Sequence, residues 1–210
     1  MTELSDDLVA NAVLVANEVV NQPGVYGPSK QWDGPVSVDA LREYVIAKTG
    51  IPLSIKDVSF EGKFTCSRIE RYKDRNEITV RFDLDQDMKR FGCVKELAHI
   101  LIDTDESMQP YGDHRIDDLV DRGIIGLASG DGPTGMATQS EYLAEIAAME
   151  IMYPLERRNI DMSASQESGV LPIRRVALER EMPPVYVAAS INEHYLRYIK
   201  TACKQAVSKG

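Results

Sequence analysis

Three side chains that could do chemistry, Glu96, His99 and Asp103, recur at intervals of three and four residues in an otherwise apolar stretch. The spacing predicts a helix over residues 89–103 that carries all three side chains on one face. Removing an imidazole and two carboxylates from water is unfavourable unless other groups compensate them. We therefore expect this helix to hold either a reactive site or a buried network of ion pairs.

Residues 95–99 read Lys-Glu-Leu-Ala-His, and they match the zinc-binding pattern His-Glu-x-x-His at every position but the first. In that pattern two imidazoles bind zinc and the glutamate acts as a base on a zinc-bound water. The ammonium group of Lys95 cannot coordinate a metal. It would repel a divalent ion by about 8 kcal/mol at a distance of about 4 Å and an effective dielectric constant near 20. The sequence therefore disfavours zinc in the usual arrangement.

The composition is that of a folded protein. The chain has 210 residues, 43% of them hydrophobic and 27% charged, which is enough to bury one sizeable core. Its cysteines, Cys66, Cys93 and Cys203, lack a Cys-x-x-Cys spacing and are expected to be free thiols. Residues 8–20 are apolar but interrupted by polar side chains, so they predict neither a signal peptide nor a membrane span. We expect a cytoplasmic protein.

The charge pattern argues against contact with nucleic acid. The net charge is −9, and seven carboxylates lie between residues 103 and 121. A surface that binds nucleic acid normally has the opposite sign, so no direct nucleic-acid binding is expected. The acidic run has no EF-hand loop pattern and is most simply a solvated face.

The hydrophobic period changes along the first half of the chain in a way that predicts an α+β fold. Helical spacing covers residues 5–21 and 38–49, with Ser37 as the N-cap of the second helix and Gly50 as its end. Residues 51–82 follow a period of two and predict a small antiparallel sheet of three strands. The chain then enters the helix that carries the candidate site.

The second half of the chain is expected to end in a helix that runs from residue 183 to about residue 207. Before it, residues 155–182 mix charges with glycine and proline and predict a loop or linker.

The order of these elements, together with the residues around Lys95, resembles the ImmA/IrrE family of zinc metallopeptidases. Residues 90–99, Arg-Phe-Gly-Cys-Val-Lys-Glu-Leu-Ala-His, are similar to the family's Arg-Phe-Thr-x-Ala followed by His-Glu-Leu-Gly-His. Residues 141–154 look like a later helix of the family that ends in proline, and residues 176–191 look like its helix, proline, helix ending. The resemblance covers about residues 5–195 and implies a zincin-like fold.

Two regions follow from this resemblance. A metallopeptidase-fold domain is expected over residues 1–155, with N-terminal helices, the small antiparallel sheet and a central helix of the active-site type. Residues 156–210 are expected to form a C-terminal linker and helical extension that pack on the same domain.

This sequence departs from the family at two of its three zinc ligands. Lys95 stands in place of the first histidine. The resemblance places the third ligand at Leu143, with Glu141 and Glu145 two residues to either side. Because two residues turn a helix by about 200°, neither glutamate is a simple substitute for a ligand at that position.

One hypothesis is that Lys95 supplies the positive charge that zinc would have supplied. It would then form a buried salt bridge with Glu96, His99 or Glu141, and Glu96 would be a vestige of the catalytic base. In the alternative, Lys95 and Glu96 extend to solvent and leave His99 as a hydrogen-bonded core histidine. The two differ in whether the charged groups are buried together.

A second hypothesis keeps hydrolysis with a rebuilt metal site. One imidazole with several carboxylates could hold zinc or manganese, and Glu96 would remain available as the general base. The candidate ligands are His99, Asp103, Glu141, Glu145 and His114. A catalytic serine or cysteine is not expected, because the sequence has no Gly-x-Ser-x-Gly elbow and Cys93 lies on a different helix face from His99.

The sequence thus predicts an α+β protein that resembles an ImmA/IrrE metallopeptidase with a decayed zinc site. We expect no cofactor, and binding of a protein or ligand in place of catalysis. The resemblance implies a protein partner such as a helix-turn-helix regulator of a phage, another mobile element or a stress response. An active metal-dependent peptidase with substituted ligands is the alternative.

Overall fold

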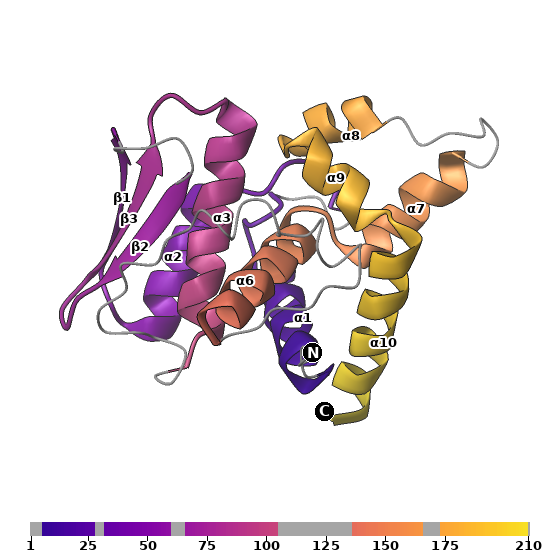
Figure 1. Cartoon of the computed structure of the whole chain (residues 1–210), viewed down its shortest axis with the longest axis horizontal. Helices are drawn as coiled ribbons and strands as arrows, with labels where there is room; N and C mark the ends of the chain where they lie inside the picture. Colours follow the sequence, from indigo (N-terminus) through magenta and orange to yellow (C-terminus); the bar gives the residue numbers. More distant parts are fainter. Residues whose placement is uncertain (1–5, 28–31, 60–65, 105–135, 166–172, 210) are drawn as a thin grey trace.

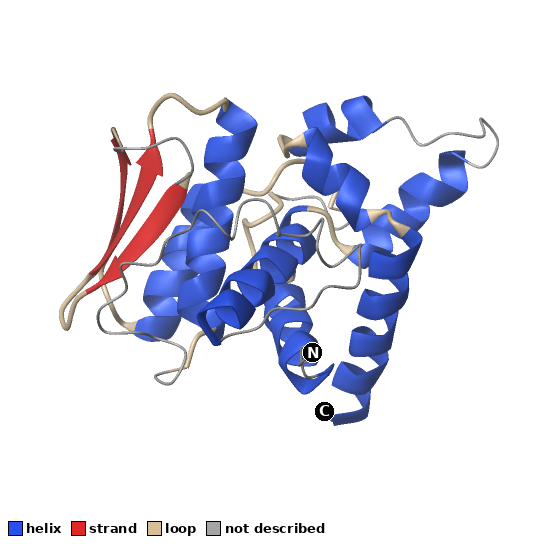
Figure 2. Cartoon of the chain, in the orientation of Figure 1, coloured by secondary structure: helices blue, strands red, loops and turns tan. Residues whose placement is uncertain are grey.

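The structure of the chain, a computed structural model, describes residues 6–27, 32–59, 66–104, 136–165 and 173–209. It has an α+β fold, as expected, with a small sheet at one side of the molecule and helices on the other (Figure 2). In chain order the elements are α1 (Asp6–Val20), α2 (Val38–Thr49), β1 (Leu53–Val58), β2 (Ser67–Arg71), β3 (Asn76–Arg81), α3 (Gln86–Ile102), α6 (Met136–Met152), α7 (Leu155–Ser165), α8 (Ile173–Arg180), α9 (Pro184–Ser190) and α10 (Glu193–Lys209).

The second helix, α2, begins and ends where its sequence predicts. The Ser37 hydroxyl accepts a hydrogen bond from the Ala40 N–H at 3.2 Å, which satisfies a donor of the first turn. Gly50 has a left-handed φ of 70°, and its N–H donates to the Ile46 carbonyl at 2.8 Å. Both ends of α2 are therefore fixed by local chemistry.

The sheet has the three predicted strands, but their arrangement differs from the prediction. The strand order is β1-β3-β2, and β3 runs antiparallel to β2 and parallel to β1. The antiparallel sheet expected from the sequence is therefore wrong for one of its two pairs. In β3, Ile78 and Val80 are fully buried, whereas β1 and β2 carry more exposed polar residues. A neighbour on each side removes the most apolar surface from water when the central strand is the most apolar one, so β3 lies at the centre of the sheet.

Helix α6 lies at the centre of the helical layer, between α3 on one side and α1 on the other (Figure 1). Helix α10 packs along the far side of α1. Small side chains of α1 permit this close packing, because Ala12 and Ala16 are buried together with Val9 and Val13. The core therefore joins the first helix of the chain to the last.

The C-terminal part of the chain is more helical than its sequence predicts. The expected loop over residues 155–182 instead contains α7 and α8. The single helix expected from residue 183 is divided into α9 and α10, because Asn192 begins a new helix there. Its side-chain oxygen accepts from the His194 N–H at 2.9 Å, and its carbonyl accepts from the Leu196 N–H at 2.8 Å.

A buried ion pair fixes α7 and α10 to α6. Arg158 of α7 donates to both carboxylate oxygens of Glu150 of α6, at 2.6 and 2.7 Å. The Tyr195 hydroxyl of α10 donates to the same carboxylate at 3.0 Å. None of the three residues is more than 3% exposed, so each depends on the others for hydrogen-bond partners. None of the described helices is both long and apolar enough to cross a membrane.

Helix α3 approaches β2 closely at Gly92. A Cβ atom at this position would lie 2.9 Å from the Ser67 Oγ and 3.1 Å from the Ser67 Cβ. Gly92→Ala is expected to force Ser67 aside and to lower the free energy of unfolding by about 1 to 3 kcal/mol, as overpacking does elsewhere. Urea unfolding measures this loss.

Gly34→Ala is the matched control, because a Cβ there meets nothing within 4 Å. It is expected to change stability by less than about 0.5 kcal/mol. Equal effects of the two substitutions would contradict a tight contact between α3 and β2.

Candidate functional site

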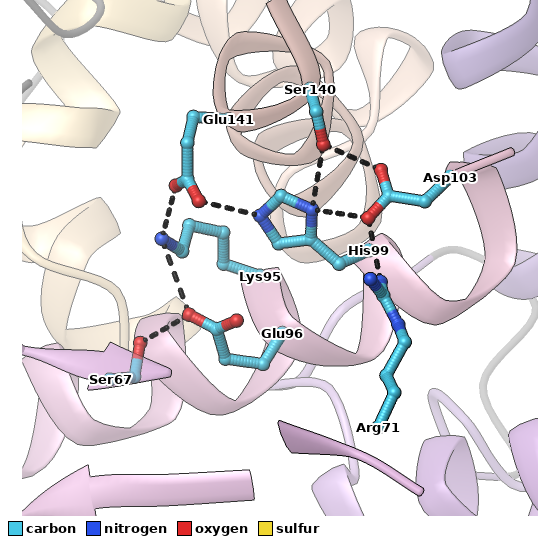
Figure 3. A network of polar contacts seen from close by, with 8 residues as sticks. All are labelled: Ser67, Arg71, Lys95, Glu96, His99, Asp103, Ser140 and Glu141. Carbon is cyan, nitrogen blue, oxygen red and sulfur yellow. Dashed lines mark hydrogen bonds and ion pairs between the residues drawn. The ribbon is translucent and has the colours of Figure 1, made fainter. Parts of the chain in front are cut away.

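Polar side chains from three elements meet between α3 and α6 (Figure 3). Helix α3 presents three of them and its C-cap residue a fourth, β2 contributes two from its inner face, and the first half of α6 contributes two more. We call this set the ion-pair cluster; its members are Ser67, Arg71, Lys95, Glu96, His99, Asp103, Ser140 and Glu141.

Lys95 lies between two carboxylates. Its Nζ donates to Glu141 Oε2 at 2.7 Å and lies 3.2 Å from Glu96 Oε1. Burial acts to lower the pKa of Lys95, but attraction to Glu141 and Glu96 outweighs it and raises that pKa well above its ordinary value. Lys95 is therefore a fixed cation that joins α3 to α6, which is the geometry of the salt-bridge hypothesis.

Glu96 does not extend to solvent, because it is only 2% exposed. The Ser67 hydroxyl of β2 donates to its Oε1 at 2.8 Å, and the Lys95 ammonium faces the same oxygen. The sequence alternative, in which Lys95 and Glu96 both extend to water, is therefore wrong for Glu96. The predicted general base is held in place by two donors.

His99 lies between two carboxylates and is 3% exposed. Its Nδ1 lies 3.1 Å from Asp103 Oδ2, and its Nε2 lies 3.3 Å from Glu141 Oε1. Burial acts to lower the pKa of His99, but the bonds to Asp103 and Glu141 outweigh it and raise the pKa to about 9. Both carboxylates thus favour the protonated, cationic form of the imidazole.

Asp103 closes the cluster at the end of α3. Arg71 Nη2 of β2 lies 2.6 Å from its Oδ2, and the Ser140 hydroxyl of α6 donates to its Oδ1 at 2.6 Å. Burial acts to raise the pKa of Asp103, but the bonds from His99 and Ser140 and from Arg71 outweigh it and lower the pKa. Asp103 is thus an ionised anchor at neutral pH.

Ser140, His99 and Asp103 are close together, yet they do not form a catalytic triad. Ser140 Oγ lies 3.3 Å from His99 Nδ1, the ring nitrogen that also faces Asp103. A triad needs serine and aspartate on opposite ring nitrogens, because one nitrogen takes the serine proton while the other donates its N–H to the aspartate.

Glu145 lies one turn beyond Glu141 on α6, beside the cluster. Burial raises the pKa of Glu145 to about 7, while the charge of Lys95 and a hydrogen bond with Tyr186 of α9 act to lower it. Glu141, in contrast, has a lowered pKa, because attraction to Lys95 and bonding to His99 outweigh its burial. The two glutamates of one helix face thus differ in protonation near neutral pH.

The structure places Glu141, and not Leu143, opposite His99. Leu143 packs against the hydrophobic core instead, as expected for a residue about 200° away on the helix. Of these two residues, Glu141 faces the cluster and Leu143 does not. His114 lies outside the described residues.

The cluster already holds a cation where a metal would need a ligand. A metal site needs ligand lone pairs, and the Lys95 ammonium, which has none, donates to Glu141. The carboxylates of Glu141 and Asp103 are already paired with Lys95 and with Arg71. The positive charges that a metal would supply are therefore already present as side chains.

Three members of the cluster are absent from the sequence prediction. Ser67, Ile69 and Arg71 share the face of β2 that packs on α3. The sequence signal for Ser67 and Arg71 was therefore their spacing of two residues on either side of the apolar Ile69. Ser140 had no such signal, because nothing in the sequence places it beside Asp103. Pairing between distant elements decides which of these residues meet.

The raised pKa of His99 predicts that the fold loses stability as the pH rises through about 9. A group with a higher pKa in the folded state stabilises the fold fully below its unfolded pKa, about 6.5 for histidine, and loses this effect as its proton leaves. Urea unfolding between about pH 7 and pH 10 is expected to show a decline of at most about 1.4 kcal/mol per pH unit.

His99→Gln is expected to flatten this decline, because glutamine does not titrate. His194→Gln is the control, since His194 is exposed on α10 and makes no contact with the cluster in the described part of the chain. It is expected to keep the native slope. A native profile that is flat above pH 7 would contradict a charged His99.

No protein-family model matches this sequence, and no curated protein matches it.

Proposed function

We propose that the chain acts by binding a protein partner rather than by hydrolysing peptides. It is then a pseudoenzyme of the ImmA/IrrE metallopeptidase type, in which a salt bridge has replaced the metal. The observation that supports this proposal is the position of Lys95 Nζ, which lies 2.7 Å from Glu141 and 3.2 Å from Glu96. A cation held there by two carboxylates excludes a second cation by repulsion.

Glu96 is poorly placed to act as a base. A general base must reach the proton that it removes, either directly or through one water. The Oε1 of Glu96 instead accepts from Ser67 and faces Lys95, and the residue is almost fully buried. These contacts favour an anchor role for Glu96 over catalysis.

The charge of the chain supports the choice of partner. A helix-turn-helix regulator that binds DNA carries a basic surface, and a chain with a net charge of −9 attracts such a surface over long range. We therefore propose a helix-turn-helix regulator of a phage or stress response as the partner, met in the cytoplasm. No direct contact of the chain with nucleic acid is part of this proposal.

Metal content and cleavage together test the proposed function. Protein purified without chelator is expected to contain no stoichiometric zinc or manganese, and incubation with a candidate helix-turn-helix regulator is expected to give a complex of two intact chains. Size-exclusion chromatography detects the complex, and mass spectrometry shows whether the regulator keeps its full length. Stoichiometric metal with shortening of the regulator would favour the metal-dependent peptidase instead.

A further inference from the structure

Helix α9 covers one end of the ion-pair cluster through a single tyrosine. The Tyr186 ring stacks on Phe91 of α3, with centroids 3.6 Å apart and ring planes 12° apart. Its hydroxyl is hydrogen-bonded to Glu145 of α6. Because Glu145 is in turn attracted to Lys95, Tyr186 connects α9 to the end of the cluster that lies nearest Lys95.

Helix α9 is short. It has seven residues, of which Val187 and Ser190 are buried and Tyr186 and Ala189 are partly buried against the core. Figure 1 shows α9 between α8 and α10. A short helix with few buried apolar groups belongs to the low-stability end of a fold and can open without global unfolding.

The turn that leads into α9 is strained. Glu181 has a φ of 47°, in the left-handed region where glycine is favoured. Its N–H donates to the Leu178 carbonyl at 3.3 Å, and the Met182 N–H donates to the Ala177 carbonyl at 3.0 Å. These two bonds define a Schellman motif, whose left-handed position is usually glycine.

An ion pair holds the strained residue against α3. The Glu181 carboxylate lies 3.0 Å from Arg90 Nε. Arg90 also donates to the Val36 carbonyl, so the pair joins the turn to α3 and to the segment before α2. Side-chain contacts, rather than the intrinsic preference of the backbone, therefore keep Glu181 in this conformation.

The segments on both sides of α9 are firmly anchored. Arg180, at the end of α8, donates to the carbonyls of Trp32 and Gly34. Trp32 has a φ of 51°, and Trp32 and Glu181 are the non-glycine residues with positive φ among those that the structure describes. Beyond α9, Tyr195 is fixed to Glu150. The strained turn at Glu181 thus lies between Arg180, which is anchored to the segment before α2, and the short helix α9.

We propose that α9 is a hinged cap on the ion-pair cluster, with its hinge at Glu181 and two latches, the Arg90–Glu181 ion pair and the Tyr186–Glu145 hydrogen bond. Opening relieves the strain at Glu181 and exposes Glu145 and the adjoining face of Lys95. The hinge is a property of the free chain. Its use to admit a protein partner to the cluster rests on the proposed function.

Amide hydrogen exchange of the free chain, followed by mass spectrometry, tests the hinge. Glu181→Gln removes the ion pair and keeps the strain, and Tyr186→Phe removes the hydroxyl and keeps the ring stack. Each is expected to speed exchange of residues 184–190 by about fivefold to tenfold, the effect of one lost hydrogen bond or ion pair. Exchange in α1 and α10 is expected to stay unchanged.

Two further variants separate the latches from the strain. Glu181→Gly removes the same charge as Glu181→Gln but tolerates a positive φ. The amide hydrogens of residues 184–190 are therefore expected to exchange at least threefold more slowly in Glu181→Gly than in Glu181→Gln. Tyr44→Phe removes a Tyr–Glu hydrogen bond of 2.7 Å between α2 and α1, and it is expected to leave α9 unchanged.

Equal amide exchange rates of α9 in Glu181→Gly and Glu181→Gln would overturn the hinge. So would an exchange rate of α9 in Glu181→Gln and Tyr186→Phe that is no faster than in the native chain, or one that rises only together with the rates of α1 and α10. Because the measurement uses neither partner nor metal, its result is independent of the test of the proposed function. Partner binding that tightens in Tyr186→Phe would then link the two.

Discussion

Lys95→Met is expected to lower the free energy of unfolding by about 3 to 5 kcal/mol, the usual effect of removing one partner of a buried ion pair. Methionine keeps the apolar stem of the side chain and removes its charge. Glu141 retains His99 as a partner, but Glu96 retains only the Ser67 hydroxyl. The Glu96 carboxyl group, which is 2% exposed, then loses the ammonium group that it faces.

Equilibrium unfolding in urea at neutral pH measures this loss. Lys56→Met is the matched control, because Lys56 forms an ion pair of 2.8 Å with Glu77 on the surface of the sheet, where its own side chain is 54% exposed. Lys56→Met is expected to lower the free energy of unfolding by less than about 1 kcal/mol. Lys95→Met combined with Glu96→Gln is expected to recover part of the loss. Similar losses at positions 95 and 56 would show that Lys95 is not a structural cation.

Lys95→His is expected to convert the cluster into a zinc site. The new imidazole and His99 are separated by one helical turn, and both positions face the Glu141 carboxylate in the native chain. Two histidines and a glutamate are the protein ligands of many catalytic zinc sites. Zinc displaces the proton of His99, so the affinity is expected to rise with pH. Elemental analysis after dialysis against zinc is expected to find stoichiometric metal in this variant and not in the native chain.

Two companion variants identify the third ligand. Adding Glu141→Gln to Lys95→His is expected to abolish stoichiometric zinc, because the amide is a poor ligand. Adding Leu143→Glu is expected to bring no gain, because residue 143 packs on the core and not on the cluster. Zinc binding that requires Leu143→Glu would restore the residue placement implied by the family resemblance, and it would contradict the geometry described here.

Helix α2 and the face of α3 follow directly from local sequence. Ser37 and Gly50 fix the ends of α2, because capping depends on neighbouring backbone groups alone. Lys95 and His99 share a face because helical geometry fixes the relation between residues four apart. For the same reason the sequence was enough to indicate that a cation stands where a zinc ligand was expected.

The sequence failed where a choice depended on distant partners. The strand β3 took the centre of the sheet, which is decided by comparing the burial of all three strands rather than by the pattern of any one. Residues 155–165 became helical although their composition suggested a loop, because Arg158 pairs with Glu150 of α6, which also accepts from Tyr195 of α10. Tertiary contacts commonly override weak local preferences in this way.

By itself the sequence determined the α+β class, the bounds of α2 and the row of polar side chains on α3, because each depends on residues within a few positions of one another. Only the tertiary structure decided that Glu141 meets Lys95 and His99, and that Ser67, Arg71 and Ser140 complete their pairing. Which charges compensate one another depends on how β2 and α6 pack against α3. That packing is set by burial summed over the whole core.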